Sequence, residues 1–174
     1  MKRFIPILLL ASMGTMLACK STKNTTTSTS ATSNELIQTE PQVLASINRT
    51  ACYGQCPMYK ATFMDNGEVE YIGRRFVDNI GTYKTVITAE EVEEIIKQIE
   101  VADYFSLDSL YPTPIADFPS CITEAQLNGQ RKKVVNRRNP PVELKNFEKF
   151  LDSLLHARDW EKVSDNTDYF NTSK

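Results

Sequence analysis

Two Asn-Gly dipeptides constrain the fold of this 174-residue chain more than any other feature. Each stands between two short segments in which apolar and polar side chains alternate. Asn and Gly tolerate the positive φ angles of a two-residue hairpin turn, and alternation places the apolar side chains on one face of a sheet. The sequence therefore predicts one β-hairpin over residues 58–73, turning at Asn66-Gly67, and a second over residues 121–135, turning at Asn128-Gly129.

Two more strands and two helices are predicted around these hairpins. Alternating residues indicate strands at 43–47 and 82–87. Thr88 and Glu91 have the spacing of a capping box and precede an apolar helical stripe, Val92, Ile95, Ile96 and Ile99. Asn139 is the predicted cap of the second helix, with Pro140 at its first position. The apolar stripe of that helix comprises Leu144, Phe147, Phe150, Leu151, Leu154 and Leu155.

The predicted order is β-β-β-β-α-β-β-α, which indicates an α+β domain over residues 40–160. Hairpin-linked strands favour a single antiparallel sheet of about six strands, with the two amphipathic helices covering one face. Residues 107–120 hold Pro112, Pro114 and Pro119 without a clear period, so we expect a long, stiff loop there. Residues 161–174 are polar and are expected to form a mostly disordered tail.

The N-terminal segment predicts export and lipid anchoring. Residues 1–18 combine a basic start with an apolar run too short to span a bilayer, which is typical of a signal peptide. The run Met16-Leu17-Ala18-Cys19 resembles a bacterial lipobox, which implies that Cys19 carries acyl chains, including palmitate, that attach the chain to a membrane. The alternative is plain secretion. Residues 19–39 are rich in Ser and Thr and predict a flexible tether. The expected location is the bacterial outer membrane, facing the periplasm or the cell surface.

Composition excludes several functional classes. A formal net charge of −2 argues against a nucleic-acid-binding surface. With a single His and no Gly-rich phosphate loop, the chain lacks the residues of most hydrolases and nucleotide-binding proteins. We therefore predict no cofactor, and a catalytic role is left open but not favoured.

The most unusual motif is Cys52-Tyr53-Gly54-Gln55-Cys56-Pro57-Met58-Tyr59. With the later Ala102-Asp103-Tyr104-Phe105-Ser106-Leu107 and Asp117-Phe118-Pro119-Ser120 it resembles the bacterial family called domain of unknown function 6438. The resemblance spans residues 43–155. It supports the domain limits and implies no activity.

The cysteines allow several interpretations. Cys52 and Cys56 are predicted to form a disulfide in an oxidising compartment, since Gly54 lets the loop close tightly. Cys121 is in phase with the core side of its strand and is predicted to be a buried thiol, with a bridge to Cys52 or Cys56 as the alternative. A redox role is a weaker hypothesis, because the spacing is C-x-x-x-C rather than C-x-x-C and the pair precedes a strand. A zinc site is also weaker, because His156, the one histidine, falls on the solvent face of its helix.

Binding candidates lie on the cysteine loop and the proline loop: Tyr53, Gly54, Pro57, Tyr111, Asp117 and Phe118. The competing interpretation of the proline loop is local, with Asp117 forming a turn and the two aromatic side chains folded onto the sheet. A basic run follows the second hairpin turn: Arg131, Lys132, Lys133, Arg137 and Arg138. Long cations are typical of an edge strand that must avoid pairing with other chains, and binding of lipid phosphates is the alternative.

These observations favour a non-catalytic, lipid-anchored domain that binds an envelope protein or another envelope component. The alternative is a thiol-based redox or metal-binding envelope protein that uses Cys52, Cys56 and Cys121. A structural envelope protein is a third class.

Overall fold

The computed structural model describes residues 40–168 of the chain. The predicted signal peptide, Cys19 and the tether lie outside the described residues. The elements are β1 (Val43–Arg49), β2 (Met58–Met64), β3 (Glu68–Arg75), β4 (Gly81–Val86), α1 (Ala89–Val101), the short 3-10 helix η1 (Tyr104–Ser106), β5 (Leu110–Tyr111), β6 (Cys121–Leu127), β7 (Gln130–Asn136), α2 (Val142–Ser153) and β8 (Glu161–Ser164).

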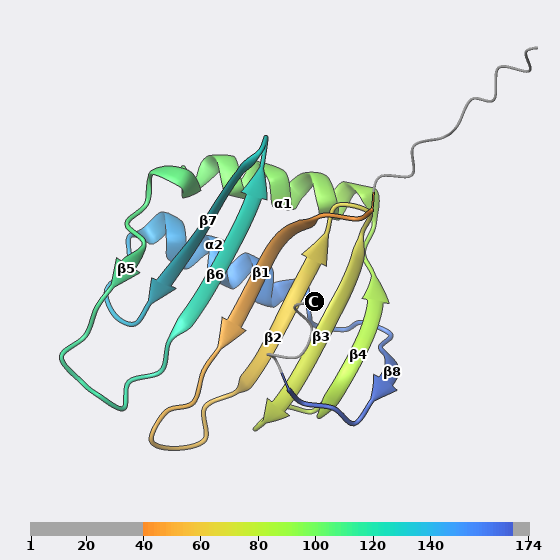
Figure 1. Ribbon diagram of the computed structural model, residues 1–174, viewed down its shortest axis with the longest axis horizontal. Helices are drawn as coiled ribbons and strands as arrows, with labels where there is room; N and C mark the ends of the chain where they lie inside the picture. Colours follow the sequence, from red (N-terminus) through yellow and green to blue (C-terminus); the bar gives the residue numbers. More distant parts are fainter. Residues whose placement is uncertain (1–39, 169–174) are drawn as a thin grey trace, which may run out of the picture. The chain divides into compact units, whose positions relative to one another are not determined.

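The strands form one sheet in the order β5-β7-β6-β1-β2-β3-β4-β8 (Figure 1). Both predicted hairpins are confirmed as the antiparallel pairs β2–β3 and β6–β7. Asn128 adopts a φ of 52° and Gly129 a φ of 76°, as a turn with two left-handed residues requires. The α+β class and the single sheet are confirmed. The expected sheet of about six antiparallel strands is close but not exact: the sheet has eight strands, and β5 pairs with β7 in parallel.

The two extra strands lie where the sequence shows no periodic pattern. β5 is a two-residue strand inside the predicted proline loop, and β8 is a four-residue strand inside the predicted polar tail. Every residue of β8 is exposed, so alternation of burial does not mark it. β8 pairs with the outer edge of β4, which lies far away in the sequence, so a local pattern does not predict the pairing.

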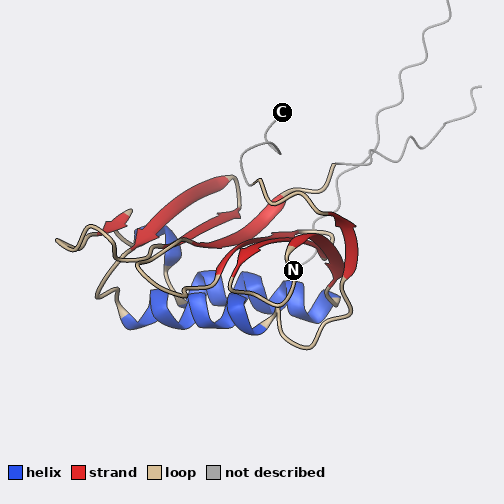
Figure 2. Cartoon of the chain, turned by 90° about the horizontal axis from the view of Figure 1, so that it is seen from below, coloured by secondary structure: helices blue, strands red, loops and turns tan. Residues whose placement is uncertain are grey.

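Both helices cover the same face of the sheet (Figure 2). Side chains of alternate strand residues, such as Ile47 and Phe63, meet Ile95, Ile99 and Phe147 in the core. The capping box of α1 is confirmed, with Thr88 accepting from the backbone of Glu91 and Glu91 accepting from the backbone of Thr88. Within the described residues, neither helix is long and apolar enough to cross a bilayer.

The predicted start of the second helix is wrong. Pro141, not Asn139, precedes the first turn of α2, and no side chain caps it. A residue before proline avoids the helical region, and Asn139 precedes Pro140, which in turn precedes Pro141. Asn139 instead adopts a left-handed φ of 51°, and the helix begins only after the second proline.

The basic run lies on a strand that is only partly an edge. β5 pairs with β7 at Val135 and Asn136, so the outer side of β7 is covered there. Lys132 donates to the carbonyls of Phe105 and Leu107, which ties η1 to the sheet. Arg131 pairs with Glu124 on the neighbouring strand. These cations have partners within the domain, which weakens the alternative that they bind lipid phosphates.

Candidate functional site

The two ends of the sheet are built differently (Figure 1). One, here called the turn end, carries the two Asn-Gly turns and the start of α1. The other, here called the loop end, carries the longer connections 50–57, 76–80 and 112–120, which follow β1, β3 and β5. Because β1 runs from the turn end to the loop end, the described chain enters the domain at the turn end.

The cysteine loop projects from the loop end. The predicted disulfide between Cys52 and Cys56 is confirmed, with their Cα atoms 5.8 Å apart. Gly54 adopts a φ of 153°, and its amide donates to the carbonyl of Cys52 at 2.9 Å. This tight ring directs Tyr53 outward, and its side chain is 93% exposed. The disulfide therefore presents an aromatic side chain to solvent.

The cysteine loop and the proline loop lie side by side. The amide of Thr50 donates to the carbonyl of Ser120 at 3.0 Å, and the amide of Ser120 donates to the Thr50 hydroxyl at 2.8 Å. Arg137 fastens the proline loop by donating to three of its carbonyls, at distances of 2.8 to 3.1 Å. A cavity of about 260 Å³ lies between the loops, with Pro57 and Phe118 in its wall.

The other predicted binding residues take different places. Asp117 and Phe118 are exposed on the proline loop. Tyr111 lies in β5, packs against the core, and accepts a hydrogen bond from the amide of Asp108 at 3.2 Å. The structure therefore brings Tyr53, Pro57 and Phe118 to one end of the molecule and gives Tyr111 a structural role.

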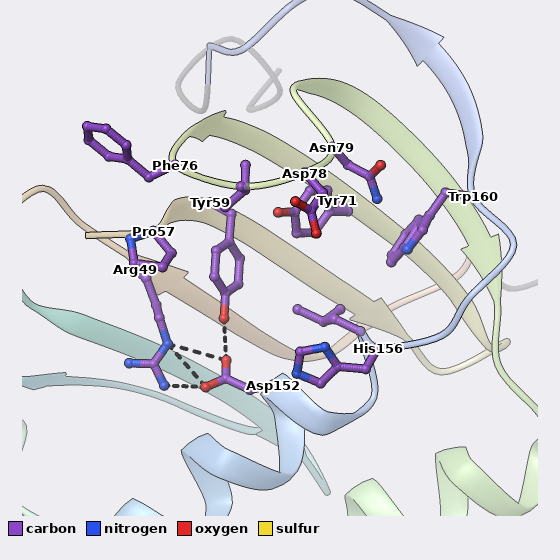
Figure 3. A pocket seen from close by; sticks show the side chains of 12 residues that line it. Arg49, Pro57, Tyr59, Tyr71, Phe76, Asp78, Asn79, Asp152, His156 and Trp160 are labelled. Atoms are coloured by element: carbon purple, nitrogen blue, oxygen red, sulfur yellow. Dashed lines mark hydrogen bonds and ion pairs between the residues drawn. The ribbon is translucent and has the colours of Figure 1, made fainter. Parts of the chain in front are cut away.

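Arg49, Tyr59 and Asp152 form a polar cluster beneath these loops (Figure 3). Arg49 and Tyr59 stand opposite each other on β1 and β2, and Asp152 comes from the last turn of α2. Arg49 donates to both carboxylate oxygens of Asp152, and the Tyr59 hydroxyl donates to one of them. The cluster joins residues 103 positions apart and locks the end of α2 to the sheet.

The electrostatics of this cluster favour a structural role over proton transfer. Burial, together with the adjacent Asp152 carboxylate, raises the pKa of Tyr59, so the phenol stays protonated. Burial alone would lower the pKa of Arg49, but its hydrogen bond to Asp152 and the surrounding acidic groups outweigh that effect and raise it. Tyr59 is a poor base and Arg49 is permanently charged, so together they can orient groups but not activate a nucleophile.

Beyond the end of α2 lies a cavity of about 410 Å³, here called the aromatic pocket. The ring of Tyr71 stacks on Tyr59 with centroids 5.4 Å apart and contacts Trp160 at 5.2 Å. Figure 3 shows Tyr59 and Trp160 on opposite sides of the pocket, Asp78 and Asn79 above it, and His156 below. The prediction that His156 is exposed is confirmed, although the side chain also lines this pocket.

Two features place Trp160 at the pocket. Ala157 adopts a left-handed φ of 52°, which reverses the chain after α2. Arg158 then donates to the carbonyl of Leu154 at 2.8 Å and pairs with the carboxylate of Glu91 at the start of α1. The hydrogen bond from Arg158 also lowers the pKa of Glu91, so the pair remains charged at neutral pH. This clamp holds the segment that carries Trp160.

Cys121 is confirmed as a free, buried thiol, which removes its predicted alternative of a bridge to Cys52 or Cys56. Burial, aided by the nearby Glu148 carboxyl, raises the pKa of Cys121, so the thiol is a weak nucleophile at neutral pH. Glu148 is itself only 5% exposed and accepts hydrogen bonds from the Asn136 amide at 2.8 and 3.1 Å. Within residues 40–168, no cluster of His, Cys, Asp or Glu is arranged to hold a metal ion.

The sequence interpretation missed Asp152, Tyr59 and Trp160 as members of a site. In the sequence, Tyr59 stands out only as the last residue of the cysteine motif, and Asp152 lies between apolar residues of the stripe of α2 without a motif of its own. The available signal was Trp160, since it is the single tryptophan in the chain.

Comparison with known proteins gives one result. No curated protein matches the chain. The family model described as a domain of unknown function, DUF6438, matches residues 43–155, which is more than half of the sequence. The match covers the cysteine loop, the proline loop and the Arg49–Asp152 pair, and it ends before Trp160 and β8. The chain therefore belongs to the DUF6438 family.

Proposed function

We propose that the chain is a lipid-anchored, non-catalytic binding domain of the bacterial cell envelope, and that the loop end is its binding surface. The lipobox-like sequence ending at Cys19 supports the anchor. The described residues begin at the turn end, next to β1. An anchor attached there leaves the loop end free to contact another envelope component.

The observation that carries the proposal is the apolar surface of the loop end. Large apolar side chains are exposed on all three of its loops: Tyr53, Phe76, Ile80, Ile115 and Phe118. Exposed apolar side chains gathered at one end of a domain mark interaction surfaces more often than isolated ones do. Two cavities open among these loops, and cavities with aromatic walls favour ligand binding.

The loop that holds Phe76 adds support. Phe76 adopts a left-handed φ of 56°, which is uncommon for a bulky side chain and costs conformational energy. The side chain is nevertheless exposed, and its ring lies under the Arg75 guanidinium, 5.0 Å from the ring centroid. Strained residues of this kind are concentrated at functional sites.

The redox alternative has less support. Its nucleophile would be Cys121, whose burial disfavours the reactive thiolate. The disulfide between Cys52 and Cys56 is explained by the loop that it shapes. A binding role needs neither a reactive thiol nor a metal.

Site-specific photo-crosslinking of the full chain in its native membrane tests the binding surface. A photoreactive phenylalanine analogue replaces Tyr53 or, separately, Phe118 at the loop end. The matched control replaces Val86, which is also exposed but lies at the turn end. We expect a recurrent adduct, seen as a discrete mass increase, from the loop-end positions only. Equal adducts from Val86, or none from the loop end, would contradict the proposal.

The anchor has its own test. Replacing Cys19 with Ala removes the acceptor of the acyl chains. We expect the variant to leave the membrane fraction of fractionated cells, since no other lipid attachment is predicted. Unchanged membrane retention would contradict lipid anchoring.

A further inference from the structure

We propose that the aromatic pocket binds a neutral saccharide, with one pyranose ring seated between Trp160 and the polar residues Asp78, Asn79 and His156. The inference rests on the proposed function, because it names the ligand class of a cavity that opens at the proposed binding surface. It is carried by the aromatic walls of the pocket, by its unpaired polar groups and by its charge.

The apolar part of the pocket suits the face of a sugar ring. Tyr59 and Tyr71 are buried and stack on each other, so their faces already have partners. Trp160 is only half-buried and borders the cavity opposite Tyr59 (Figure 3). One face of a pyranose presents C–H groups, which pack on the electron-rich face of an indole. This contact removes apolar surface from water.

The polar part of the pocket suits hydroxyl groups. Among the described residues, no hydrogen bond or ion pair joins the side chains of Asp78, Asn79 or His156 to another residue. The three offer a carboxylate acceptor, an amide that both donates and accepts, and an imidazole. They lie on two opposite sides of the pocket, above and below in Figure 3. A ligand with several hydroxyl groups, each a donor and an acceptor, can engage all of them at once.

The charge of the pocket favours a neutral ligand. Arg49 and Asp152 form an ion pair, so their charges offset each other at the pocket wall. Asp78 is then the one lining carboxylate, within the part of the chain that the structure describes, without a cationic partner. A strongly anionic ligand would be repelled by this carboxylate, whereas a neutral ligand would not. A cationic segment is the competing occupant, and the peptide titration below tests it.

The pocket is organised before any ligand arrives. The Arg158–Glu91 ion pair holds the segment that carries Trp160, and the Arg49–Asp152 pair holds the end of α2 that precedes His156. Gly73 lets the 76–80 loop approach β3, because a Cβ atom there would overlap the carbonyl oxygen of Asn79. Fixed walls reduce the ordering cost of binding.

Trp160 makes the test direct, since it is the single tryptophan of the chain and lies in the pocket. The full chain, purified from membranes in detergent, is titrated with glucose, galactose, mannose and N-acetylglucosamine while tryptophan emission is recorded. We expect a saturable change in emission with at least one sugar, and the same affinity at low and high salt because the ligand is neutral. No saturable change with any of the four sugars would overturn the proposal.

Two pocket variants and a matched control locate the site. Asp78→Ala and His156→Ala each remove a proposed hydrogen bond, and we expect each to weaken sugar affinity by about 10-fold. Both residues are exposed, so the variants are expected to fold. Val86→Ala removes an exposed apolar side chain from the turn end, outside the pocket, and should leave affinity unchanged. Equal losses in all three variants would overturn the assignment.

Isothermal titration calorimetry of Trp160→Phe separates stacking from a fluorescence artefact. We expect weaker but measurable sugar binding, since a smaller ring remains. Unchanged affinity would overturn the stacking argument. If a lysine-rich peptide gives a salt-sensitive response and the sugars give none, the saccharide proposal is overturned. The ligand would then be a cationic protein segment. Loop-end crosslinks without sugar binding would contradict only the saccharide as ligand. The absence of both crosslinks and sugar binding would also contradict the loop end as a binding surface.

Discussion

The turn end and the loop end of the sheet obtain their order from different sources. At the turn end, the turns and the helix cap form from local contacts: the capping box joins Thr88 and Glu91, three residues apart. The ion pair of Glu91 with Arg158 is the long-range addition there. At the loop end, Thr50 bonds to Ser120 across 70 positions and Arg49 bonds to Asp152 across 103. The loop end therefore depends on the assembled tertiary structure, and it is also the end that carries the aromatic pocket and the exposed aromatic side chains.

The two ends also differ in the surface that they offer to other molecules. Asn-Gly turns connect neighbouring strands with only two residues, so they expose little surface for recognition. Long loops cost more conformational entropy, and the disulfide, the prolines and the Arg137 hydrogen bonds reduce their freedom. Loops held on a rigid scaffold commonly carry binding sites.

The largest expected effect comes from a glycine at the loop end. Gly73→Ala would drive its new methyl group into the backbone of Asn79, so we expect a loss of about 3 kcal/mol or more in the free energy of unfolding. At the turn end, Gly129 has a φ of 76° and open space around the added Cβ, so Gly129→Ala should cost only about 1 to 2 kcal/mol. Urea denaturation of both variants measures the difference, and equal losses would contradict the close packing of the 76–80 loop on β3.

The next effect concerns the ion pair beneath the loops. Asp152→Ala leaves the part-buried Arg49 and Tyr59 without their shared acceptor, and we expect a loss of about 2 to 3 kcal/mol in stability. Glu124→Ala breaks a more exposed pair with Arg131 and should cost at most about 1 kcal/mol. Denaturant midpoints of both variants test this order. A larger loss in Glu124→Ala would show that the Arg49 cluster does not hold the loop end.

Removing the disulfide should have a smaller and local effect. The ring between Cys52 and Cys56 is short, so the double variant Cys52→Ser, Cys56→Ser is expected to lose about 2 kcal/mol or less. Hydrogen exchange followed by mass spectrometry should show faster exchange in residues 50–57 and an unchanged turn end. Faster exchange throughout the sheet would mean that the disulfide supports the whole fold.

The smallest effect is a pair of opposite pH dependences. Burial raises the pKa of Glu148, so the folded protein holds this proton more tightly than the unfolded chain does. The protonated Glu148 carboxyl therefore adds to the free energy of unfolding below its ordinary pKa of about 4.5. This stabilisation is lost as pH rises through the raised pKa of the folded state. The hydrogen bond from Arg158 lowers the pKa of Glu91, so that contribution is present above about pH 4.5 and is lost as pH falls.

Stability measured against pH separates the two acids. Glu148→Gln should reduce the loss of stability seen as pH rises above 4.5. Glu91→Gln should reduce the loss of stability seen as pH falls. The two curves should therefore deviate from the parent in opposite directions. Parallel deviations would contradict the different surroundings assigned to these carboxyl groups.

Sequence patterns predicted most of the fold but little of the pocket. The hairpins, the α1 cap and the Cys52–Cys56 disulfide follow from residues a few positions apart, and all are present. The start of α2 differs from the prediction because each proline keeps the residue before it out of the helical region, which outweighs the capping preference of Asn139. β8 was missed because its exposed residues carry no alternation.

The local structures follow from the sequence alone, since turn, capping and ring-closure energies involve neighbouring residues only. Tertiary structure alone decided that Asp152 meets Arg49 and Tyr59, and that Trp160 lies against Tyr71. These partners come from β1, β2, β3, α2 and the segment after α2, so each contact joins segments that are far apart in the sequence. The pocket is a product of that packing, because its walls come from segments that share no local motif.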